Sequence, residues 1–467
     1  MLFNSLHFIV FFVFVTSAYY SVPWRSRWVL LLVASAYFYA SFIPAYLLLL
    51  AVIILFDYLA GICIGLLTGW RRKCMLVMSI VANVGFLSFF KYYDFLIANM
   101  AALFGVFGLD YQPESMASSY PGLALPIGLS FHTFQSMSYT IEVYRGNQRA
   151  ERHLGIYALY VLFYPQLVAG PIERPQNVLW QFRQKMDFDW DNLRTGLWWM
   201  VWGMFKKVVI ADRLALVTDP VFENPGAWNA PALALAALFY SIQIYCDFSG
   251  YSDIALGSAR TMGFRLMVNF RSPYFARSIA GFWQRWHISL STWFRDYVYI
   301  PMGGNRRGGV RTCINLMIVF LLSGLWHGAD WKFVIWGGLH GIYLIISKIA
   351  DRPTFRLPQL PGWMQALFTF ILITLTWIFF RAHNLQHALA ILRALGTPAR
   401  WGMPALPIGT GECLFCLLLT GVLFLKERYL PDYVPATRLF WPSLGLATFL
   451  CYLLGVFGSN QFIYFQF

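Results

Sequence analysis

Long apolar stretches, separated by short polar ones, follow one another along nearly the whole chain. A membrane helix needs about 20 mostly apolar residues to cross a hydrocarbon core roughly 30 Å thick. Stretches of this character, some of them shorter than a full span, are centred on residues 2–20, 28–55, 75–90, 198–205, 232–245, 313–325, 333–346, 364–380, 413–425 and 444–457. The pattern predicts an all-α, multi-pass membrane bundle of about 10–12 transmembrane helices with additional re-entrant or interfacial helices.

The composition agrees with lipid as the solvent. Of the 467 residues, 59% are hydrophobic and only 12% are charged, whereas an average soluble domain has about 25% charged residues. No internal repeat or low-complexity linker divides the chain. We therefore expect a single membrane domain over residues 1–467, with its motif-rich part at about 120–345, and a first apolar segment that is retained rather than cleaved.

The net charge of +14 comes from short basic clusters between the apolar runs. Examples are residues 71–73, the pair Lys206 and Lys207 with Arg213, and residues 306–311. Basic loops of this kind are typical of the cytoplasmic side of a membrane protein. They do not form the continuous polar face of a nucleic-acid-binding protein, so we expect membrane lipid around the chain and no nucleic acid partner.

Two histidines stand beside apolar or aromatic segments, where an ionisable group is costly unless it has a function or a partner. His287 lies in an aromatic-rich segment, and His327 follows an apolar run and precedes Gly328. Imidazole has an unperturbed pKa near 6.5, so a neutral ring can take a proton from an alcohol and return it later. A hydrogen-bonded structural histidine is the alternative for either residue. The absent side chain of Gly328 favours substrate access to His327.

Forty positions separate His287 from His327, a length of about 60 Å if the helix were continuous. Pro301 and the glycine-rich residues 303–309 lie between them. Both features break helices, so we expect a turn that allows the two histidines to approach each other.

Other chemistries lack their signatures. The chain has no Gly-x-Ser-x-Gly elbow, no Walker loop and no His-Glu-x-x-His motif, which disfavours a serine hydrolase, a nucleotide-driven pump and a zinc protease. Cys413 and Cys416 form a CxxC pair inside an apolar run, without a second pair or a nearby histidine. This pair is interpreted as packing, and no metal site is predicted.

The chain resembles the membrane-bound O-acyltransferases, and within them the branch of the alginate O-acetylation protein. The family hallmark is a histidine after a long apolar run, with a second polar residue upstream. Leu-Trp-His-Gly at 325–328 and Arg-Trp-His-Ile-Ser at 285–289 match it. Further matching blocks are Pro-Ile-Gly-Leu-Ser-Phe-His-Thr-Phe (126–134), Ala-Gly-Pro-Ile-Glu-Arg (169–174), Tyr-Cys-Asp-Phe-Ser-Gly-Tyr-Ser-Asp (245–253), Trp-Phe-Arg-Asp-Tyr-Val-Tyr-Ile-Pro-Met-Gly-Gly (293–304) and Phe-Ile-Tyr-Phe-Gln-Phe (462–467).

The resemblance implies a helical bundle around a central funnel, with no bound cofactor and an acyl thioester such as acetyl-CoA entering from the cytoplasm. It implies His327 as general base and His287 as the supporting catalytic residue. Residues placed by the resemblance along the substrate or donor tunnel are Trp326, Trp286, Ser323, Arg295, Asp296 and His132. Arg295 and Asp296 would form an ion pair there, for which an interfacial salt bridge is the alternative.

The same resemblance implies a place in the inner membrane of a Gram-negative bacterium. Acetyl groups would pass to a periplasmic, SGNH-hydrolase-like partner within a polysaccharide synthesis and export complex, and the polymer would be alginate, cellulose or a similar polysaccharide. Two alternatives remain open from sequence: a non-catalytic conduit whose histidines relay protons, and a lipid or protein O-acyltransferase of the same superfamily.

Overall fold

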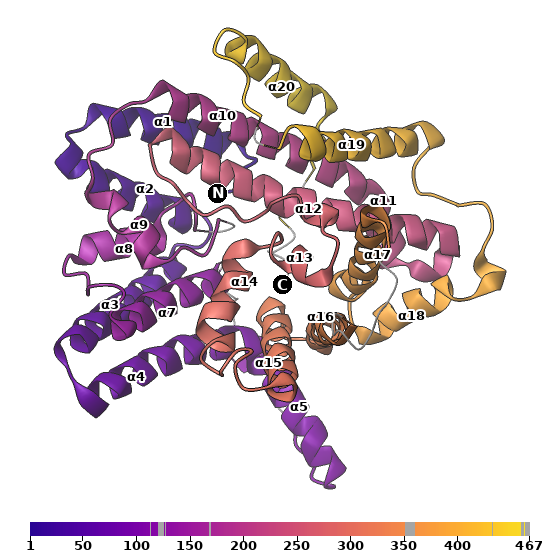
Figure 1. Cartoon of the computed structure of the whole chain (residues 1–467), viewed down its shortest axis with the longest axis horizontal. Helices are drawn as coiled ribbons and strands as arrows, with labels where there is room; N and C mark the ends of the chain where they lie inside the picture. The colour runs from indigo at the N-terminus through magenta and orange to yellow at the C-terminus, as the bar shows by residue number, and fades with distance from the viewer. Residues whose placement is uncertain are drawn as a thin grey trace. The chain divides into compact units, whose positions relative to one another are not determined.

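The structure is a computed structural model that describes residues 1–112, 114–119, 126, 128–167, 170–350, 360–431, 433–458 and 462. Every regular element in these residues is a helix (Figure 1), which confirms the predicted all-α class. Three parts of the motifs quoted above, Ile127, Ala169 and residues 463–467, lie outside the described residues. The described chain forms two compact units, and the expectation of a single domain stays a prediction.

One unit comprises residues 1–196 and 255–267. Its helices are α1 (Leu6–Ser21), α2 (Arg27–Ala40), α3 (Ala45–Leu66), α4 (Gly69–Leu87), α5 (Tyr93–Val106), α6 (Met116–Ser119), α7 (Leu129–Arg145), α8 (Leu154–Leu162) and α9 (Pro175–Val178), with the first part of α10 (Trp190–Met204) and the end of α12 (Ala230–Thr261).

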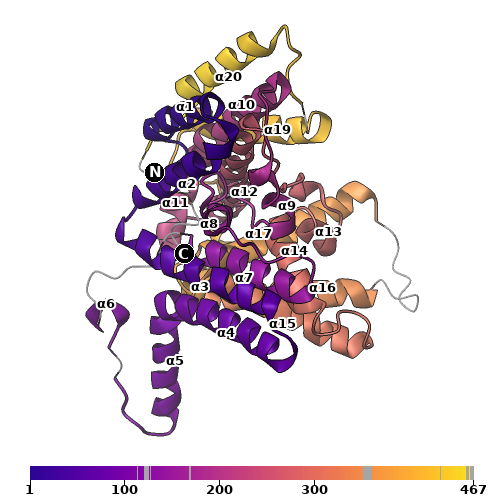
Figure 2. The ribbon, with the colours of Figure 1, turned by 90° about the vertical axis from the view of Figure 1, so that its left-hand side faces the viewer.

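Helices α3, α4 and α7 of this unit lie side by side (Figure 2). A Cβ atom on Gly61 of α3 would come within 2.5 Å of the Tyr139 ring of α7, so glycine is required for this close approach. Between the helices, the buried Asp57 carboxylate accepts hydrogen bonds from Ser79 Oγ at 2.7 Å and Asn83 Nδ2 at 2.8 Å. The polar group inside this bundle is therefore satisfied by its neighbours, as buried polar groups usually are.

The other unit comprises residues 197–254 and 268–467. It contains the rest of α10 and α12 together with α11 (Asp212–Glu223), α13 (Ile279–Trp283), α14 (Ile288–Phe294), α15 (Gly309–His327), α16 (Trp331–Ala350), α17 (Gly362–Arg381), α18 (Leu385–Leu395), α19 (Thr410–Tyr429) and α20 (Phe440–Leu454).

Helices α15 and α16 of this unit are in backbone contact along two glycines. A Cβ atom on Gly324 would lie 2.2 Å from the Phe333 carbonyl oxygen, and one on Gly337 would lie 2.1 Å from the Phe320 carbonyl oxygen. Small residues allow such approach between membrane helices, where dispersion and close packing drive association. This contact fixes the end of α15, where His327 lies, against α16.

Six helices of the described chain are long and apolar enough to cross a membrane, which identifies a multi-pass membrane protein. They cover residues 45–66, 69–106, 230–261, 309–327, 331–350 and 362–381, and shorter apolar helices cover residues 6–21, 385–395 and 440–454. The predicted apolar stretch 28–55 is divided between α2 and α3. Pro44, which has no N–H to continue a helix, immediately precedes α3.

The predicted break between the two histidines is confirmed. Helix α14 ends at Phe294, a π-helical segment follows at Arg295–Tyr299, and α15 begins only at Gly309. Between them, Gly303, Gly304 and Gly308 have positive φ, a backbone conformation that glycine adopts at little cost.

Candidate active site

His287 occupies an unusual backbone conformation directly before α14. It has φ 44° and ψ 55°, and only it and Ser272 among the described non-glycine residues have positive φ. A left-handed conformation of this kind costs a non-glycine residue of order 1–3 kcal/mol and persists only where its surroundings impose it. Such strain is concentrated at functional sites, so the backbone of His287 supports its selection as a candidate.

Asn269 holds the start of α14 in this conformation. The Ile288 N–H donates to the Asn269 carbonyl oxygen at 2.9 Å. Asn269 Oδ1 accepts from Ser289 Oγ at 2.7 Å and from the Ser289 N–H at 3.3 Å, while its Nδ2 donates to Ser252 Oγ at 3.4 Å. Three hydrogen bonds therefore connect Asn269 to the two residues that follow His287.

The imidazole of His287 is fully buried against aromatic rings. Its ring centroid lies 4.7 Å from that of Phe248, in an edge-on arrangement, and 6.0 Å from that of Trp326. Burial lowers the pKa of His287 from 6.5 to about 3, because a charged ring loses its hydration in this environment. The ring is consequently neutral near pH 7.

His327 is the last residue of α15 and is also buried. Its ring centroid lies 4.9 Å from Trp326, 5.0 Å from Trp336 and 5.3 Å from Phe380. The space expected beside Gly328 is not open, because a Cβ atom there would meet the Phe333 ring at 2.1 Å. Gly328 thus allows Phe333 to pack beside His327, and access to the histidine must come from another side.

His287 and His327 both contact one aromatic residue, Trp326. The Trp326 indole contacts His327 at 4.9 Å and His287 at 6.0 Å between ring centroids. A cavity of about 380 Å³ is lined by Ile288, which follows His287, and by Ser323, one helical turn before His327, while the two histidines themselves are not among its lining residues. The remaining wall is mainly apolar and aromatic, including Trp283 and Phe320. An apolar cavity with a few polar groups is the usual form of a small-molecule site.

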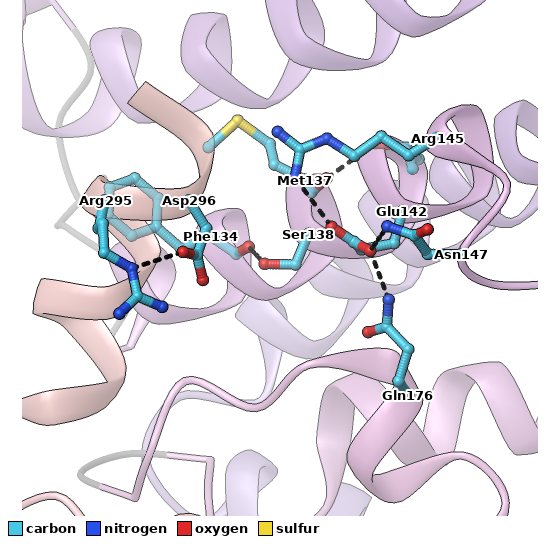
Figure 3. Close-up of polar contacts among 10 residues, drawn as sticks. Phe134, Met137, Ser138, Glu142, Arg145, Asn147, Gln176, Arg295 and Asp296 are labelled. Carbon is cyan, nitrogen blue, oxygen red and sulfur yellow. Dashed lines mark hydrogen bonds and ion pairs between the residues drawn. The ribbon is translucent and has the colours of Figure 1, made fainter. Parts of the chain in front are cut away.

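The other predicted tunnel residues have different surroundings. Trp286 is buried in an aromatic cluster, 5.4 Å from Phe282 and 5.0 Å from Trp377, and is not among the cavity residues. Arg295 lines the cavity. Its Nε donates to Asp296 Oδ1 at 2.8 Å (Figure 3), which is the predicted ion pair between neighbouring, partly exposed side chains.

His132 lies on α7 in the other compact unit, buried with Tyr39 at 5.9 Å between ring centroids. On the same helix, Glu142 accepts hydrogen bonds from Arg145 at 3.2 Å, Asn147 at 2.9 Å and Gln176 (Figure 3). This helix therefore carries a well-satisfied carboxylate network. The roles of His132 and of the other tunnel residues stay predictions.

The position predicted for Lys206 and Lys207 from the sequence was wrong. We expected a cytoplasmic basic loop, but both lysines are buried in a π-helical segment, Phe205–Ala211. Lys207 Nζ lies 2.8 Å from Asp212 Oδ1 and 2.6 Å from Asp247 Oδ1, and Lys206 Nζ lies 2.9 Å from Asp253 Oδ2. These carboxylates lie on α11 and α12, and pairing with them makes burial of the ammonium groups tolerable.

Asn269 was not predicted from the sequence to be a site residue. Its only signal was its position at the start of a polar and aromatic region that suits neither lipid nor a water-exposed loop.

Among the described residues, no group of three or more His, Cys, Asp or Glu side chains is placed to hold a metal ion.

The fold and the site together define a class: a multi-pass helical membrane protein with two buried imidazoles in contact with one tryptophan, and with an apolar cavity lined by residues near them in sequence. The model of the MBOAT, membrane-bound O-acyltransferase family, matches residues 119–385 of the chain. The chain belongs to this family, and it is an O-acyltransferase.

Similarity to individual proteins extends over most of the chain. It is 40% identical over 412 residues to the probable alginate O-acetylase AlgI of Pseudomonas putida, covering 87% of this chain and 82% of that protein. It is 37% identical over 434 residues to the peptidoglycan O-acetyltransferase of Helicobacter pylori, covering 85% and 80%. A teichoic acid D-alanyltransferase of Streptococcus thermophilus is 30% identical over 274 residues, covering 52% and 65%.

Proposed function

We propose that this protein transfers acetyl groups from acetyl-CoA, or another cytoplasmic acyl thioester, across the bacterial inner membrane for O-acetylation of an exported polysaccharide. The observation that carries the proposal is the placement of His287 and His327 around Trp326, with the nearby residues Ile288 and Ser323 lining an apolar cavity. The similarity to an alginate O-acetylase and to a peptidoglycan O-acetyltransferase supports acetyl transfer to a polysaccharide of this kind. Membership of an acyltransferase family favours an enzyme over a proton-relaying conduit.

In the proposed reaction, His327 is the general base. Its neutral imidazole takes the proton of an acceptor hydroxyl as the hydroxyl oxygen attacks the thioester carbonyl carbon. The new C–O bond forms, the C–S bond breaks, and the proton passes from the imidazolium to the departing thiolate. The products are an O-acetyl ester and a free thiol, and His327 returns to its neutral form.

His287 supports this chemistry without changing its own charge. Burial holds its pKa at about 3, so the ring is neutral across the working pH range. A neutral imidazole has one N–H donor and one acceptor nitrogen, and can therefore orient a donor carbonyl or a hydroxyl by hydrogen bonding. Trp326, in ring contact with both histidines, fixes the wall of the site.

The acceptor hydroxyl belongs to the polysaccharide itself or to a periplasmic, SGNH-hydrolase-like partner that modifies the polymer. Alginate is the leading polymer because of the similarity to AlgI over 87% of the chain. Peptidoglycan and cellulose are the other acceptors to be compared.

The test is transfer of radiolabelled acetyl from acetyl-CoA by the purified protein in lipid nanodiscs, with and without the co-expressed partner and with each polymer. We expect label transfer by the wild type, and its loss in folded His327→Ala and His287→Ala proteins. His383→Ala is the matched control, because His383 is exposed.

Undiminished transfer by His327→Ala would reject the general-base role. Absence of transfer to every polymer and to the partner, together with transfer to a lipid or protein hydroxyl, would assign the enzyme to the lipid or protein branch of the family. Thermal unfolding of each variant separates loss of chemistry from loss of fold.

A further inference from the structure

A second cavity, of about 390 Å³, is lined by the same segment of the chain, around α13, in the same compact unit. The segment formed by α13 and the turn after it contributes to both cavities with different residues. Ala280, Trp283 and Gln284 line the first cavity. Ser278, Gly281 and Arg285 line the second. At about 100° per residue these sets occupy different faces of the helical segment.

Three exposed arginines line the second cavity: Arg277, Arg285 and Arg428. Arg277 and Arg285 flank α13, while Arg428 comes from the last turn of α19. We refer to this cavity as the arginine pocket. The three arginines come from two segments that are far apart in the sequence. The pocket therefore exists only in the folded protein.

The positive charge of the arginine pocket is not compensated within the described chain. In that part of the protein, none of the three guanidinium groups makes a hydrogen bond or ion pair with another residue. Glu427, the neighbour of Arg428, instead accepts a hydrogen bond from the Tyr245 hydroxyl. Three like charges around one cavity repel one another, and an anionic ligand would relieve that repulsion.

The arginine side chains are also suited to one class of anion. A guanidinium group is planar and presents its N–H donors as a fork that matches the oxygens of a phosphate group. Arg277 is packed against the start of α17, where a Cβ atom on Gly362 would lie 2.7 Å from Arg277 Cζ. This packing limits its freedom and reduces the entropy lost when a ligand binds.

We propose that the arginine pocket binds a phosphate group. Two ligands carry this chemistry at a membrane: the nucleotide end of a thioester donor and the headgroup of an anionic phospholipid. Arg285 is two residues from His287, and the two cavities share α13, so a donor with a long arm could place its phosphates here and its thioester in the first cavity. Phosphate binding itself is independent of acyl transfer, but its assignment to a donor rests on the proposed function.

The experiment measures binding of coenzyme A and of inorganic pyrophosphate to the full chain in nanodiscs made only of phosphatidylcholine. We expect both probes to bind and to compete with each other. Replacement by Gln of Arg277, Arg285 or Arg428 should weaken binding roughly tenfold each, since each removes charged hydrogen bonds. Arg→Lys at the same positions keeps the charge but loses the fork, and should weaken binding less.

Arg311→Gln is the matched control, because Arg311 is an exposed arginine of the same unit outside the arginine pocket. In a second arm, phosphatidylglycerol is added to the nanodiscs and the retained lipid is measured by native mass spectrometry. If lipid retention depends on the three arginines but neither probe binds, the arginine pocket is a phosphate site for a lipid headgroup.

The proposal is overturned if neither probe nor lipid binding depends on these arginines, or if Arg311→Gln weakens binding as much as they do. If the wild-type protein binds the phosphate probes but transfers no acetyl group, the proposed function alone is rejected. Thermal unfolding identifies any Arg→Gln variant that fails to fold. At that position the Arg→Lys variant is used instead.

Discussion

Two buried histidines, His327 and His340, both contact the Trp336 ring, and their surroundings differ. The centroid of His340 is 4.8 Å from Trp336 and that of His327 is 5.0 Å from it. Nδ1 of His340 accepts from Trp283 Nε1 at 3.4 Å, and its Nε2 lies 3.1 Å from Thr376 Oγ1. Since Thr376 donates to the Ile373 carbonyl oxygen, its oxygen is available to accept the His340 Nε2–H.

Both nitrogens of His340 are therefore engaged in a consistent neutral tautomer, as in a structural residue. His327 lies at the end of α15, one turn after a cavity-lining serine and beside Trp326. Burial and residue type therefore do not identify a catalytic histidine by themselves. The two differ in their surroundings: His340 is hydrogen-bonded to Trp283 and Thr376, whereas His327 ends a helix whose preceding turn carries a residue that lines the cavity.

The largest expected effect concerns activity. His327→Ala should reduce acetyl transfer per folded molecule by roughly 10²–10⁴-fold, the usual contribution of a general base. His340→Leu should leave most of the activity in the fraction that folds. Transfer rates in nanodiscs, normalised to folded protein, provide the measurement, and equal losses in both variants would remove the distinction.

The next effect concerns stability. His340→Leu leaves the buried Trp283 N–H without its acceptor, which should cost about 1–3 kcal/mol of unfolding free energy. Chemical denaturation followed by tryptophan fluorescence would measure it. His383→Leu, at an exposed position, serves as the control and should change stability much less.

A third prediction tests Asn269 as a positioning residue. Asn269→Ala removes the side-chain acceptor of the two Ser289 hydrogen bonds, and should reduce transfer about tenfold through the orientation of His287. Because a displaced His287 would affect the reaction more than ground-state binding, we expect the loss in kcat rather than in KM. Asn269→Asp retains the acceptor and should recover part of the rate, whereas a purely destabilising substitution would show no such recovery in kcat.

The last prediction concerns a pH dependence of stability from His287, which appears only below neutral pH. Its folded pKa of about 3 lies below the unfolded value of 6.5, so the unfolded chain binds the proton first. The stabilising contribution is complete above pH 6.5 and is lost as the pH falls toward 3, by about 1.4 kcal/mol per pH unit. Unfolding titrations of wild type and His287→Gln should diverge in this window, and parallel curves would contradict the assignment.

Much of the helical organisation could be predicted from the pattern of apolar residues. The break between His287 and His327 followed from Pro301 and the glycines after it, and α15 begins where that reasoning placed the end of the loop. The division of residues 28–55 was less visible, since the whole stretch is apolar and only Pro44 marks the boundary. Lys206 and Lys207 were placed in a loop because their partners Asp247 and Asp253 lie some 40 residues away in sequence.

The membrane class, the helical fold and the two candidate histidines could be inferred from the sequence alone, because hydropathy and helix-breaking residues act locally along the chain. Only the tertiary structure decided that Trp326 contacts both histidines, that Phe333 fills the space beside Gly328, and that Asn269 holds the start of α14. It also gathered Arg277 and Arg285 with Arg428 around one cavity. These contacts join residues distant in sequence, and they depend on packing that no local pattern encodes.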